Sequence, residues 1–312
     1  MAMKGLVTRS TGALFTILTE NGEVQAKIKG NFRIKGIRTT NPVAVGDTVT
    51  IGTPGPDGVA YITAIDDRRN YIVRRSINLS KAVSIIAANI DCAMLVVTLA
   101  HPSTSTTFID RFLATAQAYN VPAMIVINKI DLLTDEEDRE LLDAVMYLYG
   151  SIGYEVLAVS AATGENMELL RQALKDKTTL LSGNSGVGKS TLINGLVPGL
   201  DLKTGEISAA HDTGMHTTTF SEMFSLPDGG RIIDTPGVRG FGTVEFQRDE
   251  VDHYFPELFR LSKDCRFGNC THTHEPGCAV REALERHEIA QSRYNSYLSV
   301  LEESEKPGEK YR

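Results

Sequence analysis

The chain has 312 residues and a hydrophobic content of 42%, and this length favours two or three domains over a single core. It has no apolar run of the roughly 18 residues that a membrane span needs, and its first residues, MAMKGLVTRS, lack the apolar core of a signal peptide. These observations argue against membrane and secreted proteins, and we predict a soluble, cytoplasmic protein without a membrane partner.

Charge is distributed unevenly along the chain. The formal net charge is −7, yet residues 1–75 carry eleven Lys and Arg against six Asp and Glu, which leaves 21 against 33 in residues 76–312. Such asymmetry suggests that the N-terminal part meets a polyanion while the remainder does not. Charge alone is equally compatible with a chance excess of basic residues on a solvated face.

Residues 4–65 contain short segments separated by turn residues, a pattern typical of a small β-barrel. The predicted strands cover residues 6–9, 13–19, 23–29, 47–52 and 59–65, and Asn21-Gly22 is a strong hairpin signal between the second and third. Five strands without helices favour an oligonucleotide-binding (OB) barrel, with an SH3-like barrel as the alternative. Basic residues lie on and after the third predicted strand with one aromatic residue among them, as an electrostatic groove with a stacking platform requires. They are Lys27, Lys29, Arg33, Lys35 and Arg38, with Phe32 among them.

From about residue 85 apolar runs alternate with helical periods, which predicts a parallel sheet covered by helices. The predicted strands are 92–99, 123–127 and 156–159, and the predicted helices are 108–119, one that begins at Thr134, and 165–175. Thr134 is followed three residues later by Glu137, which is a capping-box signal.

A phosphate-binding motif, G-N-S-G-V-G-K-S at residues 183–190, lies between a predicted strand at 178–182 and a predicted helix at 191–197. Its glycines let backbone N–H groups point at phosphate oxygens, and the helix N-terminus adds partial positive charge. We expect Lys189 to reach the terminal phosphates and Ser190 to bind magnesium. A Gly-rich turn without a ligand is the weaker interpretation, because strand, loop, Lys-Ser pair and helix are all in register.

Two further loops carry the chemistry of guanine recognition. The segment Asn128-Lys129-Ile130-Asp131 follows a predicted strand at its carboxyl end, where ligands bind in such sheets. The Asp131 carboxylate can accept hydrogen bonds from guanine N1–H and from the exocyclic amine, and adenine offers neither donor there. We expect Asn128 to tie this loop to the phosphate loop, Lys129 to cover the base, and Ser160-Ala161 to offer a backbone N–H to the guanine carbonyl. The predicted GTP-binding residues are Asn128, Lys129, Ile130, Asp131, Ser160, Ala161, Ser182, Gly183, Asn184, Ser185, Gly186, Val187, Gly188, Lys189, Ser190, Thr191, Asp234 and Gly237.

Two segments after the phosphate loop predict nucleotide-sensing switches. Residues 201–219 show little periodicity and end in a threonine triplet, of which Thr218 or a neighbour is expected to complete the magnesium shell. In Asp234-Thr235-Pro236-Gly237, Asp234 would hold magnesium through water, and the Gly237 N–H would contact the terminal phosphate. The predicted magnesium residues are Ser190, Thr218 and Asp234.

The residue that orients the attacking water is not obvious. Ras-like GTPases carry a glutamine directly after the D-x-x-G glycine, and here that position is Val238, which cannot form a side-chain hydrogen bond. We predict His216 as the catalytic residue, because it precedes the threonine triplet and an imidazole can orient water near neutral pH. A switch histidine that only packs or contacts RNA is the alternative.

Four clustered side chains predict a metal site near the C-terminus. Cys265, Cys270 and Cys278 supply three thiolates, and His272 or His274 supplies an imidazole, which is the complement of a closed structural zinc site. Cys92 stands alone in an apolar run. This distribution favours metal binding over a disulfide framework.

The order of these motifs is unusual, because N-K-I-D (128–131) and S-A-A (160–162) precede the phosphate loop and D-T-P-G (234–237). With H-T-T-T at 216–219 and C-x4-C-x-H-x5-C at 265–278, this circularly permuted order resembles the ribosome small subunit-dependent GTPase A family, also called RsgA or YjeQ. The resemblance covers essentially the whole chain and selects His272 over His274 as the metal ligand. The sequence departs from the family at Met215, where a basic residue is frequent.

The resemblance implies an N-terminal OB barrel (1–75), a permuted α/β P-loop GTPase domain (76–243) and a C-terminal helical subdomain (244–312) with one structural Zn²⁺. It also implies a GTPase that uses Mg²⁺ with GTP and acts in late maturation of the small ribosomal subunit, with the subunit and its rRNA as partners and as activators of hydrolysis. We expect a monomer. An RNA-binding assembly protein with a mainly structural GTP site is the alternative function.

Overall fold

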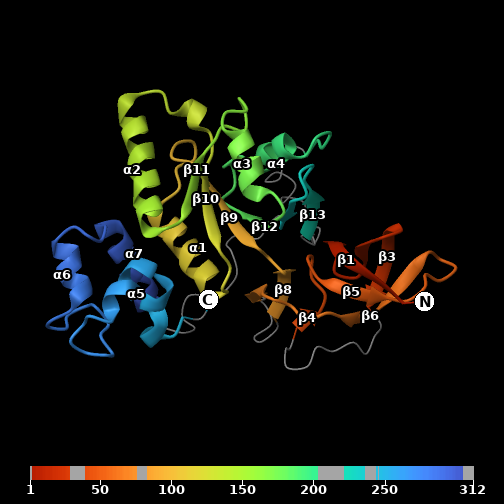
Figure 1. Cartoon of the computed structure of the whole chain (residues 1–312), viewed down its shortest axis with the longest axis horizontal. Coiled ribbons are helices and arrows are strands. Elements are labelled where there is room, and N and C mark those ends of the chain that lie inside the picture. Colours follow the sequence, from red (N-terminus) through yellow and green to blue (C-terminus); the bar gives the residue numbers. More distant parts are fainter. Residues whose placement is uncertain are drawn as a thin grey trace, which may run out of the picture.

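The computed structural model describes residues 2–28, 39–75, 83–202, 221–235, 244 and 246–304. A β-barrel, a sheet covered by helices and a small helical subdomain follow one another along the chain, and the sheet lies between the other two (Figure 1). None of the helices in these ranges is long and apolar enough to cross a membrane.

Five strands form the N-terminal barrel: β1 (Met3–Ser10), β2 (Phe15–Thr19), β3 (Gly22–Ile28), β5 (Thr48–Ile51) and β6 (Val59–Ile65). Their order is β1-β2-β3-β6-β5, and β5 pairs back onto β1, so the barrel is closed. The strands alternate between buried and exposed positions, and the buried side chains, such as Phe15 and Ile17, fill the interior. This architecture confirms the predicted OB barrel. Of its predicted basic groove, Lys27 lies on β3, whereas Phe32 and residues 29, 33, 35 and 38 lie outside the described residues.

The central sheet has the order β11-β10-β9-β12-β14-β13. Its strands are β9 (Cys92–Val97), β10 (Ala123–Ile127), β11 (Glu155–Ala158), β12 (Thr178–Ser182), β13 (Ser221–Ser225) and β14 (Arg231–Asp234). All neighbours are parallel except the edge pair β13–β14, which is an antiparallel hairpin. Every residue of β9 is buried, because helices cover both faces of the sheet. The predicted parallel sheet is therefore confirmed.

Helices α1 (Thr106–Ala118) and α2 (Glu136–Ile152) cover one face, and α3 (Met167–Leu174) and α4 (Lys189–Leu196) cover the other. The predicted capping box at Thr134 is wrong. The N-cap of α2 is Asp135, whose carboxylate accepts the backbone N–H of Asp138 at 2.8 Å. Aspartate is the stronger N-cap of the two adjacent candidates, so the helix begins one residue later than the threonine signal indicates.

One strand pairing connects the barrel to the central sheet, and a second, smaller sheet is separate from both. A separate three-stranded sheet consists of β4 (Thr39–Asn41), β7 (Tyr71–Arg75) and β8 (Val83–Ala88), in the order β4-β8-β7. The expected domain boundary at residues 75 and 76 lies between β7 and β8. In addition, Arg9 and Ser10 at the end of β1 pair with Glu222 and Ser221 of β13, so that barrel and central sheet form one continuous hydrogen-bonded sheet.

The C-terminal subdomain contains η3 (Arg248–Tyr254), α5 (Pro256–Ser262), α6 (Ala279–Glu285) and α7 (Gln291–Ser304). It packs against α1 through a buried ion cluster. Arg293 of α7 donates to Asp110 of α1 at 2.9 Å and to both carboxylate oxygens of Glu257 at 2.6 and 3.0 Å. The Tyr149 hydroxyl of α2 donates to the same oxygen of Asp110 at 2.8 Å. The cluster therefore holds four helices together in a region that water does not reach.

Candidate nucleotide site and metal cluster

The phosphate loop connects β12 to α4 at the carboxyl edge of the sheet. At Gly183, a Cβ atom would lie 2.4 Å from the Val96 carbonyl oxygen, and at Gly188 it would lie 2.4 Å from Nδ2 of Asn128. Both glycines also have positive φ, 148° and 93°. The loop can therefore adopt this shape only with glycine at both positions.

The Lys189 ammonium lies over the phosphate loop. It donates to the carbonyl oxygens of Gly183 at 2.8 Å and Asn184 at 2.7 Å. Burial lowers the pKa of Lys189 and raises that of Asp234, while the charge of each residue partly stabilises the charge of the other. The two charges are therefore close enough to influence each other, as expected for residues that share a site for phosphate and magnesium.

Asn128 connects three loops through one buried side chain. Its amide nitrogen donates to the carbonyl oxygen of Val187 in the phosphate loop at 2.9 Å, and its amide oxygen accepts the backbone N–H of Ala161 at 3.0 Å. The predicted bridge between Asn128 and the phosphate loop is present. We expected Ser160-Ala161 to offer a backbone N–H to the guanine carbonyl, but in this structure the Ser160 N–H donates to the Glu165 carbonyl and the Ala161 N–H donates to Asn128.

Asp131 and Ser160 form the part of the site expected to read the base. Asp131 lies in a 3-10 turn, η1 (Ile130–Leu132), and its Oδ1 accepts the Ser160 hydroxyl at 2.6 Å. The same hydroxyl oxygen accepts the Thr163 N–H at 3.1 Å. These bonds fix the orientation of the carboxylate.

The loop between β9 and α1 also reaches the site, and no sequence motif identified it. The Lys129 ammonium donates to the His101 carbonyl at 2.8 Å, and Pro102 lies 3.5 Å from the position that a Cβ atom on Gly186 would occupy. One signal could have revealed this loop. In a sheet with β9 beside β12, the loops at their carboxyl ends must be neighbours.

The remaining predicted nucleotide residues divide into two groups. Ser182 ends β12, Ser190 and Thr191 lie in the first turn of α4, and Ser185 is exposed at the apex of the loop. His216, the triplet that contains Thr218, and Gly237 with Val238 lie outside the described residues.

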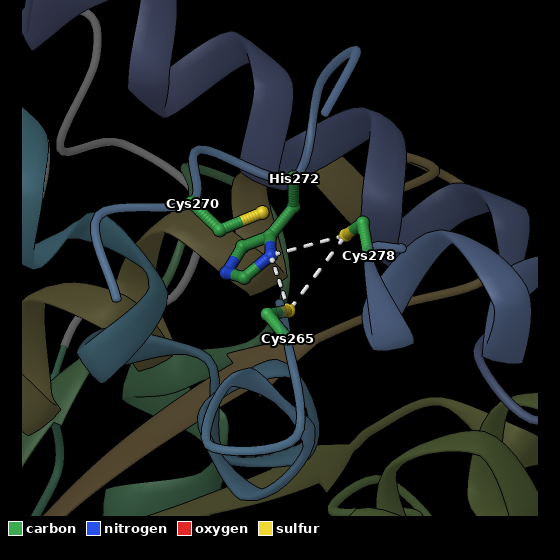
Figure 2. A group of neighbouring side chains, drawn as sticks. All are labelled: Cys265, Cys270, His272 and Cys278. Carbon is green, nitrogen blue, oxygen red and sulfur yellow. Dashed lines mark hydrogen bonds between the residues drawn. The ribbon is translucent and has the colours of Figure 1, made fainter. Parts of the chain in front are cut away.

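Cys265, Cys270, His272 and Cys278 converge between α5 and α6 (Figure 2). Their sulfur and nitrogen atoms all lie within 4.8 Å of one another, so the cluster could hold a metal ion. Nδ1 of His272 lies 3.6 Å from the Cys265 sulfur and 3.4 Å from the Cys278 sulfur, and these two sulfurs are 3.9 Å apart. Burial, reinforced by neighbouring thiols, raises the pKa of Cys270 to about 12, and a bound cation would reverse this shift.

Surrounding residues hold the cluster in shape. Asp252 lies 3.5 Å from the other ring nitrogen of His272, an arrangement that orients histidine ligands in metal sites. Tyr294 donates to the His272 carbonyl at 2.6 Å, and Glu275 accepts the backbone N–H groups of Thr271, Thr273 and His274. His274, the alternative ligand considered from the sequence, is exposed, and its ring bonds to Thr273 instead.

Comparison with known proteins identifies the family. Models of the RsgA N-terminal domain and of the RsgA GTPase match residues 4–62 and 65–244. Proteins named small ribosomal subunit biogenesis GTPase RsgA are 59% identical in Bacteroides fragilis and 57% identical in Porphyromonas gingivalis, and each match covers 99% of both chains.

Solved structures agree with these matches. YjeQ from Thermotoga maritima has a TM-score of 0.77 and 34% identity, with 98% of this chain and 99% of that chain covered. YloQ, described as a circularly permuted GTPase, has a TM-score of 0.73 and 28% identity, with coverage of 98% and 96%. The chain therefore belongs to the RsgA family of circularly permuted GTPases.

Proposed function

We propose that this GTPase acts on the small ribosomal subunit during its late maturation, and that it hydrolyses GTP to GDP and phosphate faster when bound to the subunit. The observation that carries the proposal is the Asn128 side chain, which joins the base-reading loops to the phosphate loop. Two relatives at 57–59% identity over nearly the full chain are named for biogenesis of this subunit, which supports the choice of partner.

The GTP-binding residues are those expected from the sequence. The Asp131 carboxylate, oriented by Ser160, would accept the two guanine donors, and Lys129, held by the His101 carbonyl, would cover the base. Lys189 would exchange its loop carbonyl partners for phosphate oxygens. Magnesium would be held by Ser190 and Asp234, with Thr218 completing the shell in the GTP state.

The OB barrel would supply contacts to rRNA, because its residues carry a positive charge balance in a chain that is acidic overall. The protein would act in the cytoplasm, where subunits mature, and as a monomer. The three domains would divide near residues 75 and 243.

The metal of the cysteine–histidine cluster would be one structural Zn²⁺. Tetrahedral zinc with Zn–S bonds of about 2.3 Å and a Zn–N bond of about 2.0 Å places two sulfurs about 3.8 Å apart and a sulfur and nitrogen about 3.5 Å apart. The observed separations of 3.9 Å between sulfurs and of 3.4 and 3.6 Å between sulfur and nitrogen fit these values. Four protein ligands leave no open position, so the ion would stabilise the subdomain and take no part in catalysis.

His216 would orient the attacking water. Val238 follows the D-x-x-G glycine, and its side chain cannot form a hydrogen bond to water. Another group must therefore orient the water, and His216 is the candidate because it directly precedes the threonine triplet. Docking on the subunit would place this histidine beside the terminal phosphate, which accounts for stimulated hydrolysis.

Multiple-turnover GTP hydrolysis, measured with and without purified small subunits, tests the proposal. We expect slow turnover by the protein alone and much faster turnover with subunits. Tight GTP binding without turnover in either condition would instead support the alternative, an RNA-binding assembly protein whose nucleotide is structural.

A further inference from the structure

Strand β1 has two different partners along the same edge. Its first half, Met3 to Leu6, pairs with β5 and closes the barrel, whereas Arg9 and Ser10 pair with β13 of the GTPase domain. A register shift in the β1–β2 ladder between Val7 and Arg9 marks the place where the strand changes partner. A single strand therefore belongs to both domains.

The β1–β13 pairing places three charged residues in one row. Arg9 lies directly opposite Glu222, and Glu222 lies directly opposite Asp234 on its other side. Residues that are directly opposite in antiparallel strands point to the same face, with Cβ atoms about 5 Å apart. Ile232 and Phe224, on the same face of the hairpin, pack in the core beneath α4, which begins at Lys189. The row thus leads from the barrel to the phosphate and magnesium residues.

Two negative charges, those of Glu222 and Asp234, are neighbours in this row. Two carboxylates directly opposite each other repel, so Glu222 and Asp234 favour a nearby cation. On the barrel side that cation is Arg9, whose Nε lies 3.9 Å from Oε1 of Glu222, with both side chains partly exposed. On the other side, Lys189 is near Asp234, where the magnesium of a bound nucleotide would also lie.

We propose that Glu222 is a positioning residue whose negative charge increases the affinity of the nucleotide complex for Mg²⁺, and that Arg9 of the barrel reduces this effect by neutralising the charge of Glu222. Movement of β1 away from β13 would then strengthen magnesium binding, and by reciprocity magnesium binding would weaken the Arg9–Glu222 contact. The inference rests on the proposed nucleotide site and adds a route by which the barrel acts on it.

The test is a magnesium titration of the full-length protein with bound fluorescent GDP at low ionic strength, in which the GDP dissociation rate is followed. For Glu222→Gln, we expect the Mg²⁺ midpoint to rise about three- to tenfold. For Arg9→Gln, it should fall about two- to fivefold, and this decrease should be absent in the Glu222→Gln background. Both shifts should become smaller at high salt.

Lys4→Gln is the matched control, because Lys4 is on the same strand and loses the same charge, but its exposed side chain pairs with Asp66 of the barrel domain at 2.7 Å. Equal shifts of the Mg²⁺ midpoint for Arg9→Gln and Lys4→Gln would mean that the change in net charge alone causes the effect, and would overturn the proposal. Unchanged midpoints, in variants that bind GDP one to one and melt like the wild type, would also overturn it. A wild-type protein that binds no guanine nucleotide would contradict the proposed function instead.

Discussion

Asn128 carries a donor and an acceptor on a short side chain, and both are used. Aspartate would keep the acceptor for Ala161 but lose the donor to Val187, and glutamine would be one methylene too long for a position packed against Gly188. The side chain is 3% exposed, so either change would leave a buried polar group without a partner. At the scale of single residues, the geometry of the site depends on this amide.

The choice of guanine over adenine is expected to depend on Asp131. Asp131→Asn should weaken GTP binding by about 100-fold or more and improve binding of xanthosine triphosphate, because the amide presents a donor to guanine donors. Competition against a fluorescent nucleotide measures both affinities. Asp135→Asn is the control, since asparagine is an equally good helix N-cap. Equal affinity of the wild type for ATP and GTP would refute the base-reading argument.

His216→Ala is expected to separate binding from chemistry. The variant should bind GTP and the small subunit about normally and lose most subunit-stimulated turnover, by about 100-fold if water orientation is its only role. Single-turnover hydrolysis with saturating subunits measures this, and His274→Ala, at an exposed histidine outside the metal cluster, is the control. If His216→Ala kept the full subunit-stimulated rate, another group would have to orient the attacking water.

At the scale of elements, local sequence patterns predicted most of the helices and strands. They did not predict contacts between segments that are distant in sequence. Period-two and apolar runs placed most of the predicted strands within one or two residues, because burial determines these patterns. The first strand, β1, begins three residues before its predicted start, and the small sheet of β4, β7 and β8 was not predicted. The N-cap of α2 differed by one residue, since two adjacent residues can both cap. The β1–β13 pairing and the contact of the β9–α1 loop with Lys129 join segments distant in sequence, and no local pattern encodes either.

The loop from Cys265 to Cys278 is expected to depend on its metal for its shape. Metal analysis of protein purified without chelator should find about one zinc per chain, and Cys270→Ala should lose most of it and lower the melting temperature. Cys92→Ala is the control, because this buried thiol of β9 is outside the cluster and its loss should leave zinc content unchanged. Full zinc and full stability in Cys270→Ala would contradict the ligand assignment.

At the scale of the whole molecule, the ion cluster around Arg293 determines how the C-terminal subdomain is attached. Along the chain, this subdomain follows the D-T-P-G segment (234–237) after only a few residues, which is a first attachment to the nucleotide site. The structure adds a second attachment, because Asp110 on α1 and Glu257 on α5 share the same guanidinium. α1 follows the loop that contacts Lys129 and Gly186, so nucleotide site and subdomain have a common support.

Removal of this cation should loosen the subdomain. Arg293→Met removes the cation shared by two buried carboxylates and leaves Asp110 with only the Tyr149 hydroxyl. We expect a loss of about 3–5 kcal/mol in the stability of the C-terminal part, measured by urea unfolding and by hydrogen exchange in α7. Arg286→Met, which breaks an exposed pair with Glu288, should change stability by less than about 1 kcal/mol. A small effect in Arg293→Met would mean that the other contacts, which include apolar packing and the ion pair between Arg111 of α1 and Glu303 of α7, are sufficient to attach the subdomain.

In the sheet β12 lies between β9 and β14, but along the chain it follows β9, β10 and β11, and this limits the order in which a growing chain can fold. All five barrel strands lie within residues 3–65, so the barrel can form before the later strands are synthesised. The β9, β10 and β11 segments, with the loops expected to read guanine, are synthesised before β12 and the phosphate loop, and the last strand of the sheet, β14, follows β13. The partner of Arg9 and Ser10 on β13 thus emerges long after the barrel is complete. During translation, the barrel can therefore fold first, and the proposed nucleotide site is complete only after β12 and β14 have been synthesised.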